Sequence, residues 1–333
     1  MGSMEKVSRE TGPGAGSPVL AEVVRSGFVE GRHRGIALLL DADGVVTASW
    51  GDVRAPILTR STLKPLQAVG MLRLGVPLSA PQVALACASH DGEPIHTDGV
   101  LALLDSVGLG PDALQTPPDW PGHEATRYAV IRAGGERTAL AMGCSGKHAA
   151  MLATCVHRGW DTAGYRDPAH PLQQALAATV AELTGEPVAA TVVDGCGAPQ
   201  FATTLLGTAR AFAAIATADP ASEEGRVAAA VRSRPELVSG TTRDERVLLT
   251  AVPGAIGKYG AEASYVVALP DGRVAAVKIE DGGDRARRAV MGALLARAGV
   301  LEEPGVDAAG VRAATRVPLT GAHDVVGEVR AVL

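Results

Sequence analysis

Two side chains in the stretch RSTLKP, residues 60–65, have the types and the spacing that nucleophilic chemistry requires. Serine is a poor nucleophile until a base takes its proton, and a lysine that burial keeps neutral is such a base. Residues three apart on a helix lie on one face, so the amine of Lys64 can reach the hydroxyl of Ser61. An N-cap serine followed by a surface lysine gives the same letters, and the motif alone does not separate the two interpretations.

The scarcity of lysine favours the chemical interpretation. The chain contains 31 Lys plus Arg, and only five of them are lysines. Arginine keeps its proton in a protein, whereas lysine loses it when burial or a nearby charge lowers its pKa. We therefore expect lysine to be kept where a neutral amine is needed. The lysines are Lys6, Lys64, Lys147, Lys258 and Lys278, of which Lys6 needs no such explanation.

A second hydroxyl lies in the polar stretch CASHDGEP, residues 87–94. Ser89 is the candidate catalytic residue of this stretch, and His90 and Glu93 are candidates for substrate binding. A capped turn explains the same letters, with Ser89 or Asp91 ending one helix and Glu93 starting the next. Both interpretations stay open at this point.

A metal site is the third candidate. Cys144, Lys147 and His148 fall at i, i+3 and i+4 on one predicted helix face, and Cys196 follows a predicted strand. Two thiolates and one nitrogen suit Zn²⁺ with an open position for water, and spacing alone names His148 as the nitrogen ligand. Two buried, apolar cysteines are the alternative.

The last two lysines flank a predicted hairpin. Lys258 lies between two glycines in GKYGAE, and glycine permits close approach of the backbone to a ligand. Lys278 begins KIEDGG, and a loop lysine that neutralises Glu262 or Asp281 is the simpler explanation for it.

Charge and hydropathy exclude several classes of partner. The formal net charge of −5 argues against nucleic acid and against an anionic membrane surface. No apolar run approaches the roughly 18 residues of a membrane-spanning helix, and the polar, Gly/Pro-rich N-terminus differs from a signal peptide. We therefore expect a cytoplasmic protein whose cysteines are thiols, metal ligands or core residues. Residues 1–17 are expected to be disordered.

Hydrophobic periodicity predicts the elements that must position these candidates, with Ser61 as the N-cap of the first helix. Helices are predicted over residues 61–74, 79–87, 94–107, 143–158, 170–184 and 284–298, with two more within 200–234. Strands are predicted over residues 20–30, 35–41, 45–50 and 188–193, the last one buried, and in hairpins at 128–142 and 264–280.

The order of these elements predicts an α+β fold. An antiparallel sheet is expected from both chain ends, about residues 18–55 and 245–333, flanked by helices. A mostly helical region over about 61–240 lies between them in the sequence. Residues 18–333 are expected to form one catalytic unit.

Taken together, the motifs resemble a known family. RSTLKP, CASHDGEP, GCSGKHAAML, DGCGAP, GKYGAE and KIEDG, in this order over about residues 20–300, closely resemble the rhizobial-type L-asparaginases, the third structural class of asparaginase. Each motif alone is weak, but six in order are specific. The resemblance implies a fold similar to glutaminases and serine β-lactamases, a bound Zn²⁺ ion and a homodimer.

The resemblance also implies roles for individual residues. Ser61 and Lys64 match the first Ser-Lys pair of the family. Ser89 matches a second serine, and Lys258, rather than Lys278, matches the lysine that pairs with it.

For the metal, the resemblance implies Cys144, Lys147 and Cys196 as the zinc ligands, with water completing the site. This set replaces His148, and it explains Lys147, because a neutral amine can bind zinc and a guanidinium cannot.

The implied reaction is hydrolysis of L-asparagine to L-aspartate and ammonia through an acyl-enzyme on Ser61. Arg60 is the candidate for the α-carboxylate of the substrate and Asp194 for its α-ammonium. Glutaminase activity is the nearest alternative, because one methylene in a pocket discriminates by only ~1–3 kcal/mol. A β-lactamase-like hydrolase ranks lower, since the chain lacks S-D-N and K-T-G. A non-catalytic, zinc-containing protein that binds amino acids is the alternative of another class.

Overall fold

The computed structural model describes residues 16–333. The disorder predicted for residues 1–17 falls outside this range except for its last two positions, and it stays a prediction. No helix among the described residues is long and apolar enough to cross a membrane.

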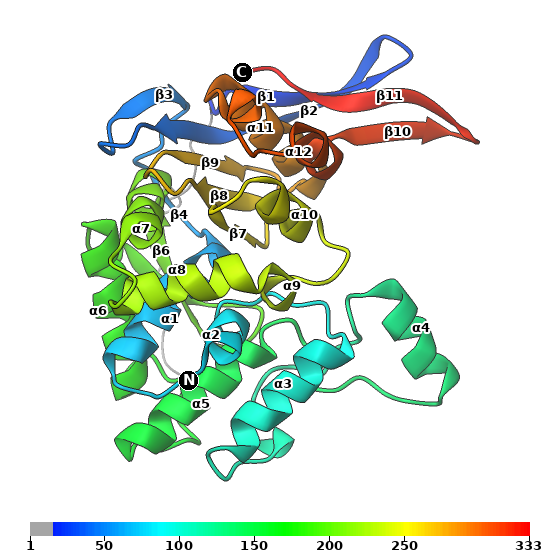
Figure 1. Cartoon of the computed structure of the whole chain (residues 1–333). Coiled ribbons are helices and arrows are strands. Elements are labelled where there is room, and N and C mark those ends of the chain that lie inside the picture. The colour runs from blue at the N-terminus through cyan, green and yellow to red at the C-terminus, as the bar shows by residue number, and fades with distance from the viewer. Residues whose placement is uncertain (1–15) are drawn as a thin grey trace, which may run out of the picture.

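An antiparallel sheet built from both ends of the chain forms one half of the molecule (Figure 1). Its order is β10-β11-β1-β2-β9-β8-β7, with β3 paired to β2. The first strand lies beside the last, with Val23 opposite Val329, which confirms the predicted α+β arrangement. The strands are β1 (Val19–Arg25), β2 (Phe28–Leu40), β3 (Val46–Trp50), β7 (Ile256–Gly260), β8 (Ser264–Ala268), β9 (Val274–Ile279), β10 (Val317–Gly321) and β11 (Asp324–Ala331).

Strand β2 changes its environment along its length. Residues 28–34 are mostly exposed or half-buried, whereas residues 35–40 are all buried. The first part belongs to the hairpins that extend beyond the body of the molecule, where water reaches the sheet (Figure 1). The second part is covered on both faces, which explains the continuous apolar run IALLL.

The helices make up most of the other half of the molecule (Figure 1). They are α1 (Lys64–Arg73), α2 (Ala80–Ala86), α3 (Pro94–Asp105), α4 (Glu124–Arg132), α5 (Ser145–Arg158), α6 (Pro171–Thr184), α7 (Leu205–Thr217), α8 (Glu223–Ser233), α9 (Pro235–Val238), α10 (Asp244–Ala251), α11 (Asp284–Arg297) and α12 (Ala308–Thr315). A small sheet of β4 (Pro56–Ile57), β6 (Pro199–Thr204) and β5 (Ala190–Val193) joins them. Helix α11 instead packs against β1, β9 and β11 of the large sheet, with α12 beside it and α10 beside α12 (Figure 1).

Three predictions of secondary structure were wrong. The single strand predicted over 20–30 contains a hairpin turn, since β1 ends at Arg25 and β2 begins at Phe28.

The hairpin predicted over 128–142 does not form, and its second arm consists of turns and irregular chain. Its first arm is the end of helix α4, whose N-cap His123 accepts a hydrogen bond from the backbone N–H of Thr126. Its Val and Ile residues suggested a strand, but α4 buries none of its residues, so no packing selects an extended chain. The strand predicted as buried over 188–193 forms as β5, yet it is an exposed edge, and Val193 is 77% exposed.

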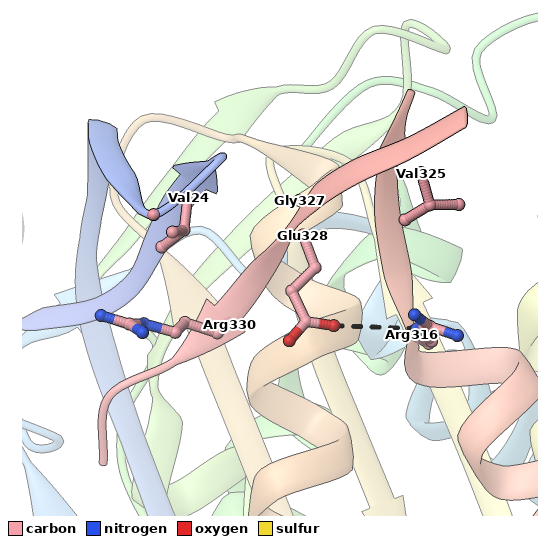
Figure 2. A pocket seen from close by; sticks show the side chains of 7 residues that line it. Val24, Arg316, Val325, Gly327, Glu328 and Arg330 are labelled. Atoms are coloured by element: carbon pink, nitrogen blue, oxygen red, sulfur yellow. Dashed lines mark ion pairs between the residues drawn. The ribbon is translucent and has the colours of Figure 1, made fainter. Parts of the chain in front are cut away.

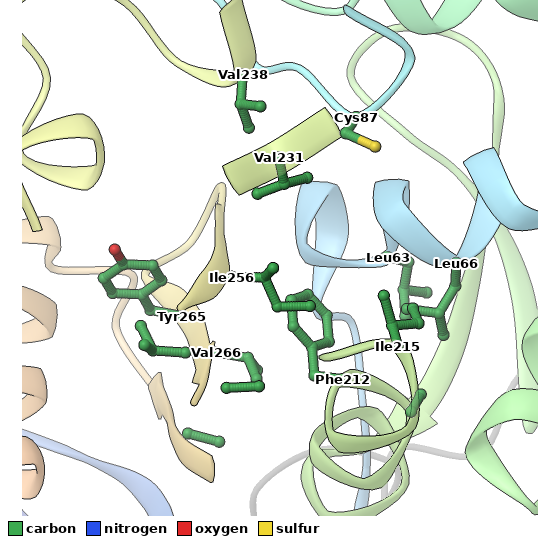
Figure 3. Packing of buried hydrophobic residues seen from close by; sticks show 14 of the residues in the cluster. Leu63, Leu66, Cys87, Phe212, Ile215, Val231, Val238, Ile256, Tyr265 and Val266 are labelled. Atoms are coloured by element: carbon green, nitrogen blue, oxygen red, sulfur yellow. The ribbon is translucent and has the colours of Figure 1, made fainter. Parts of the chain in front are cut away.

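The apolar core continues from the sheet into the helical half (Figure 3). Phe212 of α7 and Leu66 of α1 are fully buried in the same cluster as Ile256 of β7. Leu63, which precedes α1, belongs to this cluster too. The core therefore anchors the segment that carries Ser61 and the strand that carries Lys258.

Phe212→Ala is expected to lower the free energy of unfolding by about 3–5 kcal/mol, because it leaves a large cavity in a packed core. Phe28→Ala is the matched control, since Phe28 is 73% exposed. That control is expected to change stability by less than about 0.5 kcal/mol. Urea unfolding measures both variants, and equal losses would contradict the assignment of the core.

Candidate active site

Ser61 lies in a tight turn at the start of α1. The turn is a 3₁₀ helix over Arg60–Leu63, and Ser61 is 9% exposed within it. The prediction of an N-cap serine was wrong, because Leu63 occupies the N-cap of α1. Arg60 has a φ of +53°, a left-handed conformation that is uncommon for a residue other than glycine.

Strands β7 and β8 hold this turn in place. The Ser264 hydroxyl donates to the Thr59 carbonyl at 2.6 Å and lies 2.8 Å from the Thr62 hydroxyl. Gly260 of β7 approaches so closely that an added Cβ would clash with the Thr59 carbonyl. This close approach explains why the second glycine of GKYG, Gly260, has no side chain. A local strain of ~1–3 kcal/mol at Arg60 is tolerable because these contacts fix the backbone.

Lys64 is buried and contacts the second serine. Its Nζ lies 3.0 Å from Ser89 Oγ and 3.0 Å from Cys144 Sγ, and it also donates to the Ala88 carbonyl. Among the described residues, the Ser61 hydroxyl makes no hydrogen bond. Of the two serines, Lys64 therefore contacts Ser89 directly, and it makes no hydrogen bond to the Ser61 hydroxyl in the described chain.

Ser89 lies in a loop after α2 that two backbone bonds fix. The Ser89 N–H donates to the Val238 carbonyl at 2.9 Å, and the His90 N–H donates to the Gly143 carbonyl at 3.0 Å. A Cβ at Gly143 would lie 2.8 Å from the His90 carbonyl oxygen, so the approach of these loops requires glycine there.

Lys258 is fully buried in β7 beside a carboxylate. Its Nζ donates to the Tyr259 carbonyl at 2.9 Å and lies 3.4 Å from Glu245 Oε2. Glu245 also accepts a 2.5 Å hydrogen bond from the Tyr259 N–H. Burial lowers the pKa of Lys258 to about 8, against the opposing effect of Glu245. In the described part of the chain, Lys258 makes no hydrogen bond to Ser89.

Lys278 is a buried residue of β9, not a loop lysine. Its amine donates to the Ile279 carbonyl. Burial lowers the pKa of Lys278, although Glu262 and Asp281 oppose the shift. It does not line the pocket that contains the two serines.

The predicted metal ligands converge. Sγ atoms of Cys144 and Cys196 and a carboxylate oxygen of Asp194 all lie within 4.8 Å of one another. Lys147 Nζ lies 3.2 Å from Cys196 Sγ. His148 instead has its Nδ1 2.6 Å from the Tyr165 hydroxyl, so the assignment from spacing alone finds no support.

The charge states of Cys144 and Asp194 suit a metal cation. The pKa of Cys144 lies well below its usual range because of the hydrogen bond from Cys196, with Lys64 and Lys147 adding to the effect. Burial alone would raise the pKa of Asp194, but Lys147 and Arg60 lower it overall. The donor types fit zinc, but the hydrogen bond with Cys144 and burial raise the pKa of Cys196, so Cys196 and Lys147 must each lose a proton to bind the ion.

The predicted substrate-binding residues contact other protein groups. Arg60 and Asp194 form an ion pair with each other. His90 is buried, and its Nε2 lies 2.9 Å from Ser145 Oγ. Burial lowers the pKa of His90 well below its usual range, so its imidazole is neutral. Glu93 is the N-cap of α3 and accepts two hydrogen bonds from Thr241, as the capped-turn alternative expected.

A pocket of about 270 Å³ is lined by Ser61, Ser89 and Cys144. Sequence reasoning missed most of its wall. Tyr259 had a signal, its place in the GKYG motif, whereas nothing marked Arg127 or Arg243 among the many arginines. The lining consists of Ser61, Ser89, His90, Asp119, Trp120, Gly122, Arg127, Ala141, Gly143, Cys144, Arg243, Tyr259 and Ala261.

A second cavity, of about 260 Å³, lies between the hairpins of the sheet (Figure 2). An ion pair crosses it, with Arg316 Nε 3.7 Å from Glu328 Oε2. Val24, Val325 and Arg330 contribute to its wall. It shares no residue with the pocket of the two serines and contains no candidate nucleophile.

Comparison with known proteins identifies the family. The family model described as L-asparaginase II matches residues 21–331. No curated protein matches the chain. Among solved structures, the chain is similar to a β-lactamase from Mycobacterium bovis, with 16% sequence identity, 79% of this chain and 94% of that chain covered, and a TM-score of 0.38. The match to the family model spans nearly the whole chain, and the chain therefore belongs to the L-asparaginase II family.

Proposed function

We propose that the protein hydrolyses L-asparagine to L-aspartate and ammonia. Membership of the family supports amide hydrolysis of the asparaginase type. The observation that carries the proposal is one small pocket lined by both Ser61 and Ser89, with the buried amine of Lys64 3.0 Å from Ser89 Oγ. Two hydroxyls and a buried amine provide a nucleophile, a proton acceptor and a relay.

In the proposed reaction, Ser61 Oγ attacks the side-chain amide carbon and its proton passes to Lys64. Ser89, which contacts Lys64, relays that proton to the leaving nitrogen, so that ammonia departs from an acyl-enzyme. Water then attacks the ester, returns a proton to Ser61 and releases L-aspartate. Lys258, buried in β7 beside the lining residue Tyr259, acts as a second base in its neutral form.

The proposal includes one Zn²⁺ ion at Cys144, Lys147 and Cys196. Zinc at this position would supply a Lewis acid that holds a water molecule. The Asp194 carboxylate lies close enough to complete or support the ligand set. Lys147 must be deprotonated to bind the ion, and against the effect of burial the neighbouring Cys196, Cys144 and Asp194 raise the pKa of its amine.

The decisive experiment is an ammonia-release assay with L-asparagine, L-glutamine and a chromogenic β-lactam side by side. Release from asparagine that disappears in Ser61→Ala supports the proposal. Release from glutamine alone would indicate a glutaminase, and turnover of the β-lactam alone another serine hydrolase. Binding of asparagine without ammonia would indicate a non-catalytic amino-acid-binding protein. The homodimer and the cytoplasmic location stay predictions.

The pH profile should report the buried Lys258. With a pKa of about 8, the Lys258 amine is protonated below that pH and neutral above it. We expect kcat/KM to rise with pH through about 8. In Glu245→Gln the ammonium form loses its buried carboxylate partner, so the pKa of Lys258 falls and the rise moves to lower pH.

Glu182→Gln is the control for this profile, because it removes an exposed carboxylate that pairs with Arg73. It should leave the position of the rise unchanged. A Glu245→Gln enzyme that is folded by circular dichroism and keeps the wild-type profile would contradict a base role for Lys258.

A further inference from the structure

Two arginines line the pocket without a role in the reaction described above. Arg127 belongs to α4, and Arg243 directly precedes α10. The arginine expected to bind the substrate carboxylate, Arg60, does not line this pocket and pairs with Asp194. The pocket therefore has cationic side chains that the sequence did not single out.

Arg243 is held rigidly by a buried carboxylate. Its Nε lies 2.8 Å from both carboxylate oxygens of Asp91, and its Nη2 donates to the same group. Asp91 is only 3% exposed. Within residues 16–333, Nη1 of Arg243 makes no hydrogen bond, so this end of the guanidinium remains available as a donor.

Arg127 is held by carbonyl oxygens and keeps its full charge. Its Nε donates to the Pro121 carbonyl at 2.8 Å and its Nη2 to the Gly122 carbonyl at 3.4 Å. No carboxylate of the described chain lies within ion-pair distance of it. A guanidinium in a pocket wall without a counter-charge is a ready partner for an anion.

The turn at residues 121–123 helps to position the guanidinium groups of both Arg127 and Arg243. The His123 N–H donates to the Asp91 carbonyl at 3.0 Å, and a Cβ added to Gly122 would lie 2.5 Å from Asp91 Oδ1. Asp91 thus packs against the turn whose carbonyls hold Arg127, while its carboxylate holds Arg243. Such mutual fixing lowers the entropy cost of binding a ligand.

We infer that Arg127 and Arg243 form the carboxylate subsite of this pocket, and that they bind the α-carboxylate of a small amino-acid amide. The inference rests on the proposed function, because it assigns the substrate's orientation relative to Ser61. Planar guanidinium groups match a carboxylate in geometry as well as charge. Asp91 pairs with Arg243, whereas Arg127 has no ion pair among the described residues, so Arg127 supplies the positive charge for a single carboxylate.

The test compares ligands that differ only in the α-carboxylate. L-asparagine and 3-aminopropanamide are the substrates, and L-aspartate and β-alanine are the corresponding ligands for calorimetry. In Arg127→Gln, we expect kcat/KM for L-asparagine and the affinity for L-aspartate to fall roughly 10- to 100-fold, as for other charged hydrogen bonds. The values for 3-aminopropanamide and β-alanine should stay within about 2-fold, because these ligands never used the subsite.

Arg132→Gln is the matched control, since it removes an exposed arginine from the same helix without touching the pocket. It should change neither ligand pair. Arg127→Lys should be intermediate, because it keeps the charge but loses the planar fork. Arg60→Gln should preserve the preference for the α-carboxylate.

Several outcomes would overturn the subsite. Equal losses for both ligand pairs in Arg127→Gln would indicate a structural role. Loss of the preference in Arg60→Gln, but not in Arg127→Gln, would assign the carboxylate to Arg60. Wild-type enzyme that does not bind L-aspartate would also refute it. Wild-type protein that releases no ammonia, yet binds L-aspartate through Arg127, would refute the proposed function and support the subsite.

Discussion

Ser61→Ala is expected to lower kcat/KM for L-asparagine by at least ~10⁴-fold, as loss of a nucleophile does in other serine hydrolases. The substitution removes one hydroxyl from a turn that β7 and β8 hold, so the fold should persist. Lys64→Ala should cost a similar factor. Because the two groups act as a unit, the double variant should be hardly worse than either single variant. Ammonia release under saturating and limiting substrate measures these effects.

Lys64→Arg separates a base from a mere positive charge. Lys64 is 1% exposed, and an arginine at this position keeps the charge but cannot accept a proton. We expect it to be as inactive as Lys64→Ala. An active Lys64→Arg enzyme would contradict the base role.

Ser89→Ala tests the choice between the serines, because Lys64 contacts Ser89 directly. If Ser89→Ala abolished acylation while Ser61→Ala preserved it, Ser89 would be the nucleophile. Mass spectrometry of the trapped acyl-enzyme distinguishes the two. Zinc content should be measured in each Lys64 variant, because Lys64 Nζ also lies 3.0 Å from Cys144 Sγ.

Cys144→Ala is expected to reduce bound zinc from about one ion per chain to nearly none, because it removes one of only three proposed protein ligands. Its loss also leaves Lys147 buried without a ligand role. If the ion mainly shapes the pocket, KM should rise more than kcat falls, the signature of lost uniform binding. Elemental analysis and steady-state kinetics measure the two effects.

Cys155→Ala is the control for the metal prediction, since Cys155 is equally buried but lies outside the donor group. It should keep its zinc. Zinc affinity of the wild type should fall as pH drops, because protons compete for thiolate and amine. If Cys144→Ala kept its zinc and His148→Ala lost it, the ligand set would be wrong.

The sequence alone determined most elements and singled out the candidate reactive residues. Periodicity and turn residues act over a few positions, so α3, α5, α6 and the hairpin of β8 and β9 could be predicted to within a few residues. The scarcity of lysine favoured buried amines at Lys64, Lys147 and Lys258, whereas Lys278 was expected in a loop. Lys64, Lys147 and Lys258 are at most 2% exposed, and Lys278, at 7%, is buried against the expectation.

Only the tertiary structure decided which of these groups meet. Lys64 contacts Ser89 across 25 positions and Arg60 pairs with Asp194 across 134, distances over which no local pattern carries information. Glu245 and Arg127, which no sequence pattern singled out, lie on helices α10 and α4. The sequences of these helices are typical of surface helices. The burial or orientation of these two side chains depends on what packs beside them, and packing is set by the whole chain. For the same reason α4, which buries nothing, was mistaken for a strand.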